Sequence, residues 1–425
     1  MNTNTILLLG SYTGQDSFGD KCLLRCVVSQ FQTVFGPEVR TVCDIEENAE
    51  MARKVVPRGQ ITEISRIFAA WFNRLRRCHI PFLLQIPATL FLFPIWLIVN
   101  EDNGWTFGRV LEEIRSCSCL YYYGGTQLSE QWFNANFPPL LLLMLLCRCF
   151  GKPVYWGPQQ YGPEKKWQWA CLRFAITHFV TDASTRNDAC RALLGLPETK
   201  LLCDEVFSCT RRYPINSRLE RPRTFILINM RASNFVRDAT EAEYRAYGAL
   251  LSLVHQRVGL PFKLFQMSGV TFCDDRQFHQ FLDPHGFGHL PVEILPPLED
   301  EQALIDLAER AYGTISMSFH GCIFSMIGGC PAVPVTSGPY YDYKYADFDR
   351  YTGNQRVPLI SLQHLDLMLA TDTVVAYFER YDPARTAETR VRAAARIGSW
   401  YLQIRNQCAT EVSEPEAEHL SEVSQ

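Results

Sequence analysis

The stretch that decides the fold is residues 316–336, which read SMSFHGCIFSMIGGCPAVPVT. It predicts the end of a strand, a loop that carries His320, a helix of small and apolar residues over Cys322–Gly329, and a second strand over Ala332–Thr336. A strand–helix–strand unit of this size is typical of parallel α/β sheets, which bind ligands at the carboxyl ends of their strands. His320 stands at such a strand end and is therefore the first candidate for a functional residue.

The same alternation runs through the chain on both sides of this stretch. Apolar runs predict strands at 6–9, 39–43, 120–123, 153–156, 179–181, 200–203, 224–229, 262–267 and 313–317. Helical patterns lie between them, and two more, at 365–381 and 386–406, end the pattern. We therefore expect an α/β fold with parallel sheets, in the form of two Rossmann-like domains that face a central cleft.

A polar stretch rich in Arg and Pro, Arg211–Arg223, marks the best domain boundary. The sequence predicts an N-terminal domain over 1–212, with an apolar insert at 80–99, and a C-terminal domain over 213–385. A terminal helix over 386–408 and a disordered acidic tail over 409–425 would follow.

Composition excludes a disordered chain and argues against a dedicated nucleic-acid binder. The chain has 425 residues, of which 47% are hydrophobic and 20% charged, with a formal net charge of −4. The 16 cysteines include no Cys-x-x-Cys pair and lie apart from clustered His. Free, buried thiols in a reducing cytosol are therefore expected in place of a zinc site or a disulfide framework, and the protein is predicted to be cytoplasmic.

The segment Ile80–Val99 complicates this picture because it is uncharged over the length that spans a bilayer. Three prolines interrupt it, and a single span would separate the first strand from the rest of its domain. Three interpretations stay open: a buried helix pair, a membrane-surface or re-entrant element beside the basic flank of Arg74, Arg76 and Arg77, and a true span. The apolar run Phe137–Cys149 lies between two predicted strands, so a buried crossover helix accounts for it.

Three glycine-containing turns follow predicted strands. They are the loop Gly10–Lys21, the pair Gly124-Gly125, and the turn Gly157–Pro163. Because parallel strands end at one edge of a sheet, these turns are expected to line one rim, where the backbone can approach a ligand closely. Each alone is equally compatible with a tight turn that binds nothing.

Four basic side chains are expected at the crevice between the domains: His320, Arg186, Arg231 and Lys344. Together they suit a small anion that carries both a carboxylate and a phosphate. The structural alternatives are a satisfied core histidine, an Arg186 that pairs with Asp182 or Asp188, and a solvated loop arginine at 231.

These motifs resemble, in order and spacing over about residues 6 to 350, the polysaccharide pyruvyl transferase family. The matching elements are Gly19-Asp20, Gly124-Gly125-Thr126, the turn Pro158-Gln-Gln-Tyr-Gly-Pro163, Arg186-Asn-Asp-Ala-Cys190, Asp204-Glu-Val-Phe207, Ser318-Phe-His320 with Pro331, and Tyr340-Tyr-Asp-Tyr-Lys344. The chain departs from the family where Ser318 replaces an arginine, Cys190 a serine and Asn187 an acidic residue. Arg231 or Arg350 could supply the missing cation.

The resemblance implies a GT-B-like fold and the transfer of the enolpyruvyl unit of phosphoenolpyruvate to a sugar, which forms a cyclic pyruvyl ketal. It implies that His320 is the general acid and that Arg186 and Lys344 hold the anionic groups and stabilise the departing phosphate. The expected donor-binding residues are Arg231, Ser318 and Gly321. The expected acceptor-binding residues are Gly14, Asp16, Asp20, Gly124, Gly125 and Gln159.

The implied partners are phosphoenolpyruvate as co-substrate and a sugar acceptor that can be lipid-linked, with no metal, no cofactor and no nucleic acid. A lipid-linked acceptor would favour peripheral contact with the inner membrane face through residues 80–99. Two other functions fit the same residues. One is a GT-B glycosyltransferase that uses a nucleotide sugar; the other is a degenerate, non-catalytic binder in polysaccharide assembly, which the arginine-to-Ser318 change supports.

Overall fold

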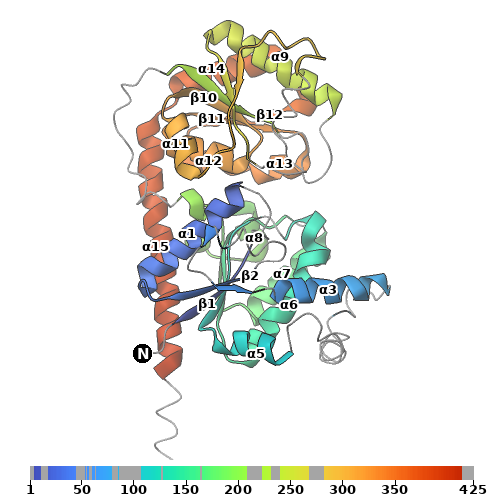
Figure 1. Cartoon of the computed structure of the whole chain (residues 1–425), viewed down its shortest axis with the longest axis vertical. Coiled ribbons are helices and arrows are strands. Elements are labelled where there is room, and N and C mark those ends of the chain that lie inside the picture. Colours follow the sequence, from blue (N-terminus) through green and yellow to red (C-terminus); the bar gives the residue numbers. More distant parts are fainter. Residues whose placement is uncertain are drawn as a thin grey trace, which may run out of the picture. The chain divides into compact units, whose positions relative to one another are not determined.

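Figure 1 shows the computed structural model of the chain. The residues that the structure describes are 4–10, 18–44, 53, 55–56, 60–62, 64–78, 85, 107–125, 128–162, 165–207, 223–230, 240–267 and 282–413. They form two compact units. The N-terminal unit comprises Met1–Gln15, Leu23–Asp204 and Arg396–Gln425, and the C-terminal unit comprises Asp16–Cys22 and Glu205–Ala395.

The N-terminal unit is built on a parallel six-stranded sheet in the order β3-β2-β1-β4-β5-β6. Its strands are β1 (Thr5–Leu9), β2 (Arg40–Asp44), β3 (Gln60–Thr62), β4 (Cys119–Tyr122), β5 (Val154–Gln159) and β6 (Asp182–Thr185). Its helices are α1 (Phe18–Phe35), α3 (Ile64–Arg77), α5 (Phe107–Ser116), α6 (Glu130–Cys149), α7 (Lys166–His178), α8 (Asp188–Leu194) and the 3-10 turn η2 (Glu198–Lys200).

The C-terminal unit repeats the plan with the strand order β12-β11-β10-β7-β8-β9, again all parallel. Its strands are β7 (Phe225–Asn229), β8 (Phe262–Leu264), β9 (Val292–Ile294), β10 (Ala311–Ser316), β11 (Ala332–Thr336) and β12 (Ile360–Ser361). Its helices are α9 (Glu241–Val258), α11 (Glu301–Ala308), α12 (Phe319–Ile327), α13 (Pro339–Lys344), α14 (Leu367–Arg380) and α15 (Pro383–Ser413), with 3-10 turns η4 (Phe348–Thr352) and η5 (Leu362–His364).

The sequence explains why both sheets are parallel and covered. The central strands β1, β4, β5 and β7 are buried along their whole length, as expected for strands with helices on both faces. The predicted α/β class with parallel sheets is confirmed. In each sheet the connections turn in opposite directions on either side of one pair of strands, β1 and β4 in the first sheet and β7 and β10 in the second. Open α/β sheets bind ligands at such switch points.

The units differ from the predicted domain boundaries in two ways. Residues 16–22 belong with the C-terminal unit, where the Phe18 N–H donates to the Met267 carbonyl at 3.0 Å. Helix α15 runs without a break through residue 395, and its part from Arg396 onward belongs with the N-terminal unit, where Trp400 Nε1 donates to the Tyr121 hydroxyl at 3.3 Å. The helix continues to Ser413, so the first residues of the tail expected to be disordered are helical; residues 414–425 lie outside the described residues.

The apolar insert at 80–99 also lies outside the described residues, apart from Gln85, which is buried. Within the described ranges, no helix has both the length and the apolar character needed to cross a bilayer. Helix α6 contains the other apolar run, and most of its side chains from Phe137 to Cys147 are buried, which confirms the predicted buried crossover helix. Its apolar residues cover all faces because α3 and α5 pack against it as well as β4 and β5.

Two short strands and one cysteine differ from the sequence prediction. The strand expected at 179–181 lies at Asp182–Thr185, and the strand expected at 200–203 is reduced to a bridge between Leu201 and Thr185. The cysteines of the described residues carry free thiols, most of them buried, with the exception of Cys26, which is disulfide-bonded. The expectation of free thiols therefore fails at Cys26.

Candidate active site

His320 lies in the first turn of α12, directly after β10, at the switch point of the second sheet. The sequence placed it in a loop and began the helix at Cys322. The helix begins earlier because Ser318 caps it: the Ser318 hydroxyl accepts the Gly321 N–H at 3.2 Å. A serine cap of this kind stabilises a helix by about 1 kcal/mol. The first turn of the helix fixes the position of His320, which is half-buried as a residue and whose ring Nε2 is buried.

A buried polar network holds this turn in place. The Ser318 N–H donates to Ser316 Oγ at 3.0 Å, and the Ser316 hydroxyl lies 3.4 Å from Oδ1 of Asn229, which ends the neighbouring strand β7. Gly321 is required here because a Cβ would lie 2.9 Å from Ser316 Oγ and 3.0 Å from the Phe265 ring. Ser318, which replaces the family arginine, is thus buried and engaged in the backbone of the turn.

Gly19 lies directly against the His320 ring. A Cβ at Gly19 would stand 2.0 Å from His320 Nδ1 and 2.6 Å from its Cγ, well inside any van der Waals contact. Gly19 and the neighbouring Asp20 sit in the first turn of α1, and the Phe18 ring packs edge-on against Phe324 of α12 at 5.8 Å. The glycine-aspartate pair from the first loop is therefore brought to the histidine although they are about 300 residues apart in sequence.

Lys344 reaches the same place from α13. Its Nζ lies 5.6 Å from the centre of the Phe319 ring and 6.0 Å from that of Tyr340, and Phe319 also contacts His320 at 5.7 Å between ring centres. The Phe319 ring is thus a shared wall between the lysine and the histidine. Cation–π contacts of this type contribute about 0.5–2 kcal/mol and fix the direction of the ammonium group. Lys344 comes after strand β11, as the sequence indicated, and is the last residue of the short helix α13.

The thiol nearest to this turn is not a candidate nucleophile. Cys322 is fully buried, and burial raises its pKa to about 12 in spite of hydrogen bonds with Tyr345 and Ser316 that act in the opposite direction. The thiolate form is the reactive one, so this cysteine is inert at neutral pH. His320 and Lys344 both contact the Phe319 ring, and Asp20 follows Gly19 in the first turn of α1.

In the N-terminal unit, the predicted glycine turns lie at the carboxyl ends of adjacent strands. A Cβ at Gly10, after β1, would meet the Tyr123 ring at 2.4 Å, and Gly125, after β4, has a φ of +144° that favours glycine. Gln159 ends β5 and is buried. Its Nε2 donates to the Tyr122 and Tyr123 carbonyls at 3.2 and 3.3 Å, so this amide ties the end of β5 to the end of β4, where the Gly124-Gly125 turn begins.

Arg186 lies on the same rim, after β6, and is 4% exposed. It forms a buried ion pair with Asp204 and donates to Gln160 Oε1 at 3.4 Å. Its partner is therefore neither Asp182 nor Asp188. Asp182 instead pairs with Lys200. Asn187, which stands where the family has an acidic residue, caps α8 by accepting the Cys190 N–H at 2.9 Å.

The structure thus groups the predicted site residues by unit. His320, Lys344, Ser318, Gly321 and Asp20 belong to the C-terminal unit, together with Gly19, whose contact with the histidine was not predicted. The residues of the N-terminal rim are Gly124, Gly125, Gln159 and Arg186. Gly14, Asp16 and Arg231 lie outside the described residues.

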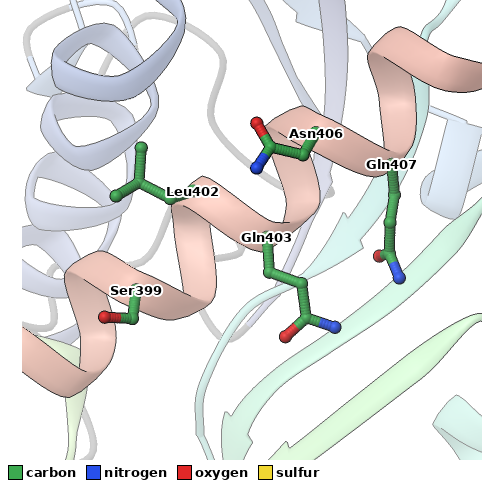
Figure 2. A pocket seen from close by; sticks show the side chains of 5 residues that line it. All are labelled: Ser399, Leu402, Gln403, Asn406 and Gln407. Atoms are coloured by element: carbon green, nitrogen blue, oxygen red, sulfur yellow. The ribbon is translucent and has the colours of Figure 1, made fainter.

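The N-terminal unit also has a hollow along α15. Figure 2 shows it lined by one face of α15, from Ser399 to Gln407. The Gln403 amide there donates to Asp182 Oδ2 at 2.8 Å and lies 3.5 Å from Lys200 Nζ, so it holds the helix in place. Among the residues that the structure describes, no charged side chain lines this hollow.

The sequence matches the family model described as polysaccharide pyruvyl transferase over residues 49–339. No curated protein matches it. Among solved structures, the S. aureus MnaA–UDP co-structure superposes with a TM-score of 0.54 at 10% identity and covers 93% of this chain and 94% of its own.

Another similar structure is UDP-GlcNAc 2-epimerase from Neisseria meningitidis bound to UDP-GlcNAc, with a TM-score of 0.51 at 11% identity, 96% of this chain covered and 100% of its own. At such low identity these matches establish the fold alone. The fold is GT-B-like, as the sequence predicted.

Proposed function

The chain belongs to the polysaccharide pyruvyl transferase family, and from that premise we propose that it moves the enolpyruvyl group of phosphoenolpyruvate onto a sugar of a polysaccharide or glycolipid precursor, with His320 as the general acid. The observation that carries the proposal is the position of the His320 side chain. The imidazole is held at a sheet switch point between Gly19 and the Phe319 ring, and Lys344 shares that ring.

In the proposed reaction, His320 donates a proton to the methylene carbon of phosphoenolpyruvate, which becomes a methyl group, and the positive charge develops at the carbon that bears the phosphate. One sugar hydroxyl attacks that carbon, the bond to phosphate breaks, and a second hydroxyl of the same sugar attacks in turn. Two hydroxyl protons are released; one balances the proton taken from His320 and the other leaves with inorganic phosphate. The products are the pyruvyl ketal and phosphate.

Two described features support an anionic donor beside His320. The N-terminus of α12 directs its dipole towards the site, which favours negative charge, and Lys344 supplies a cation whose direction is fixed by two aromatic rings. We therefore assign Lys344 to the phosphate or carboxylate of the donor, and Ser318 and Gly321 to the turn that the donor meets. Arg231 stays a proposal from the sequence.

Arg186 has a different place in the proposal. Its guanidinium is buried and its charge is balanced by Asp204, so stabilisation of the departing phosphate rests on Lys344. Arg186 then orders the rim on which we place the acceptor, together with Gly124, Gly125 and Gln159. Asp20 follows the glycine that touches His320, so its carboxylate is our candidate to accept a hydroxyl proton. Gly14 and Asp16 extend this acceptor side in the sequence-based proposal.

A thermal-shift comparison tests the donor assignment, because a ligand that binds the native state alone raises its stability by mass action. The protein is titrated with phosphoenolpyruvate and, separately, with UDP-GlcNAc, in wild type and in Lys344→Ala. We expect stabilisation of the wild type by phosphoenolpyruvate and a weaker effect in the variant. Stabilisation by the nucleotide sugar alone would instead indicate a glycosyltransferase, and no response to either ligand would favour the non-catalytic binder.

A further inference from the structure

We propose that the outer face of α7 is a docking surface for anionic lipid. This helix carries two parallel stripes on its exposed side. Trp167 and Phe174, which are 40% and 53% exposed, lie two turns apart on one stripe, and Lys166 and Arg173, also exposed and two turns apart, lie on the stripe beside it. The opposite face, from Gln168 to Ala175, is buried against the unit.

The exposed aromatics are held rigidly and are not loose surface residues. Trp167 packs edge-on against Phe133 of α6 at 5.6 Å, and Phe133 stacks on Phe137 at 4.7 Å. Phe174 contacts the rings of His178 and Phe179. Large aromatic side chains that stay exposed on a fixed helix are costly in water and are typical of contact with a partner or a membrane interface.

The positive charge of this surface favours anionic lipid over other possible binding partners. Neither α7 nor α3 contains an acidic residue, and both pack against α6 in the same unit (Figure 1). Helix α3 also ends in three arginines, Arg74, Arg76 and Arg77, of which the first and last are exposed. A basic surface with Trp and Phe beside it is complementary to the anionic headgroups and acyl boundary of a membrane leaflet. The uncharged segment Ile80–Val99 follows α3 directly in the sequence.

This surface is tested by flotation of the full chain with vesicles. Wild type is compared on phosphatidylcholine vesicles and on vesicles that also contain phosphatidylglycerol, at low and high salt. We expect binding to the anionic vesicles alone, weakened by salt. Lys166→Gln with Arg173→Gln should lower the affinity about 25-fold, since each interfacial cation contributes about fivefold. Phe174→Ser should also release the protein, because the aromatic stripe is half of the contact.

Leu369→Ser is the matched control, because Leu369 is 65% exposed on α14 of the other unit and should not alter binding. Vesicle binding that survives the α7 substitutions unchanged would overturn the proposal and transfer the contact to another segment. Absence of vesicle binding, with self-association that Phe174→Ser abolishes, would overturn it in favour of a second copy of the chain. Neither result bears on the proposed transfer reaction, because vesicle binding needs no donor.

Discussion

The close contact between Gly19 and the His320 ring predicts a large loss of activity for Gly19→Ala. The new methyl carbon would lie 2.0 Å from His320 Nδ1, 2.6 Å from Cγ and 2.9 Å from Cβ, whereas non-bonded carbon and nitrogen atoms settle about 3.5 Å apart. The imidazole must therefore move by about 1.5 Å at Nδ1, and the rigid first turn of α12 leaves side-chain rotation as the main route. A displacement of about 1 Å from the productive geometry can lower a rate about 100-fold.

We therefore expect Gly19→Ala to lower the turnover of phosphoenolpyruvate by about 100-fold or more, equivalent to about 2.7 kcal/mol of transition-state stabilisation. Stability should change little. Replacing glycine by alanine within a helix gains up to about 1 kcal/mol, which offsets part of the about 1–3 kcal/mol cost of the crowded contact. The assay is phosphate release from phosphoenolpyruvate with a lipid-linked saccharide mixture as acceptor, beside thermal unfolding of the same samples.

Gly398→Ala is the matched control, because Gly398 also lies in a helix and a Cβ there meets nothing within 4 Å. That variant should be as active as wild type and slightly more stable. A Gly19→Ala protein that folds and turns over phosphoenolpyruvate at the wild-type rate would refute the reasoning, since it would show that the position of His320 does not govern the chemistry.

Three further predictions follow from the described contacts. Lys344→Met should weaken phosphoenolpyruvate binding at least tenfold in thermal-shift titrations, because it removes the cation beside Phe319; unchanged affinity would remove the lysine from the donor site. Arg186→Ala should lower the free energy of unfolding in urea by about 3–5 kcal/mol, because it leaves the Asp204 carboxylate buried without a counter-charge. The double variant Arg186→Met with Asp204→Leu should recover most of this loss. A single variant as stable as wild type would contradict the ion pair. Burial raises the pKa of Cys322 from 9.0 to about 12, so between these pH values the folded state keeps a proton that the unfolded thiol releases. The contribution of this thiol to the free energy of unfolding is therefore complete below pH 9 and is lost as the pH rises towards 12. In urea melts under reducing conditions, Cys322→Ala should flatten the alkaline loss of stability by about 1.4 kcal/mol per pH unit; an unchanged slope would contradict the burial effect.

The sequence predicted the two parallel sheets because buried strands and amphipathic helices leave a periodic signal, and the strand-end position of His320 followed from it. Contacts between distant segments leave no such signal. Gly19 packs on His320, but the two residues lie at opposite ends of the alternating strand and helix pattern. The sequence therefore indicated a turn at Gly19 and not its contact with the histidine. For Arg186 the sequence suggested a ligand anion, with Asp182 or Asp188 as the alternative partner, but the fold brings Asp204 to it from beyond α8.

Ser318 shows the limit of motif comparison. Compared with the family pattern, Ser318 replaces an arginine. In the structure it is a buried helix cap, and α12 therefore begins at Phe319 and not at Cys322 as predicted. The exposed stripe of α7 carries no comparable sequence signal, because the exposure of an apolar side chain is decided by which neighbours cover it.

The central claim, that His320 protonates the methylene carbon of phosphoenolpyruvate during transfer to a sugar, is tested most directly by running the reaction in D₂O. The full chain is incubated with phosphoenolpyruvate and the lipid-linked saccharide mixture, and the products are examined by mass spectrometry and NMR. The account predicts a pyruvyl ketal whose methyl group carries one deuterium from solvent, formed by wild type and not by a folded His320→Ala protein. A ketal without deuterium, or equal product from the variant, would contradict it.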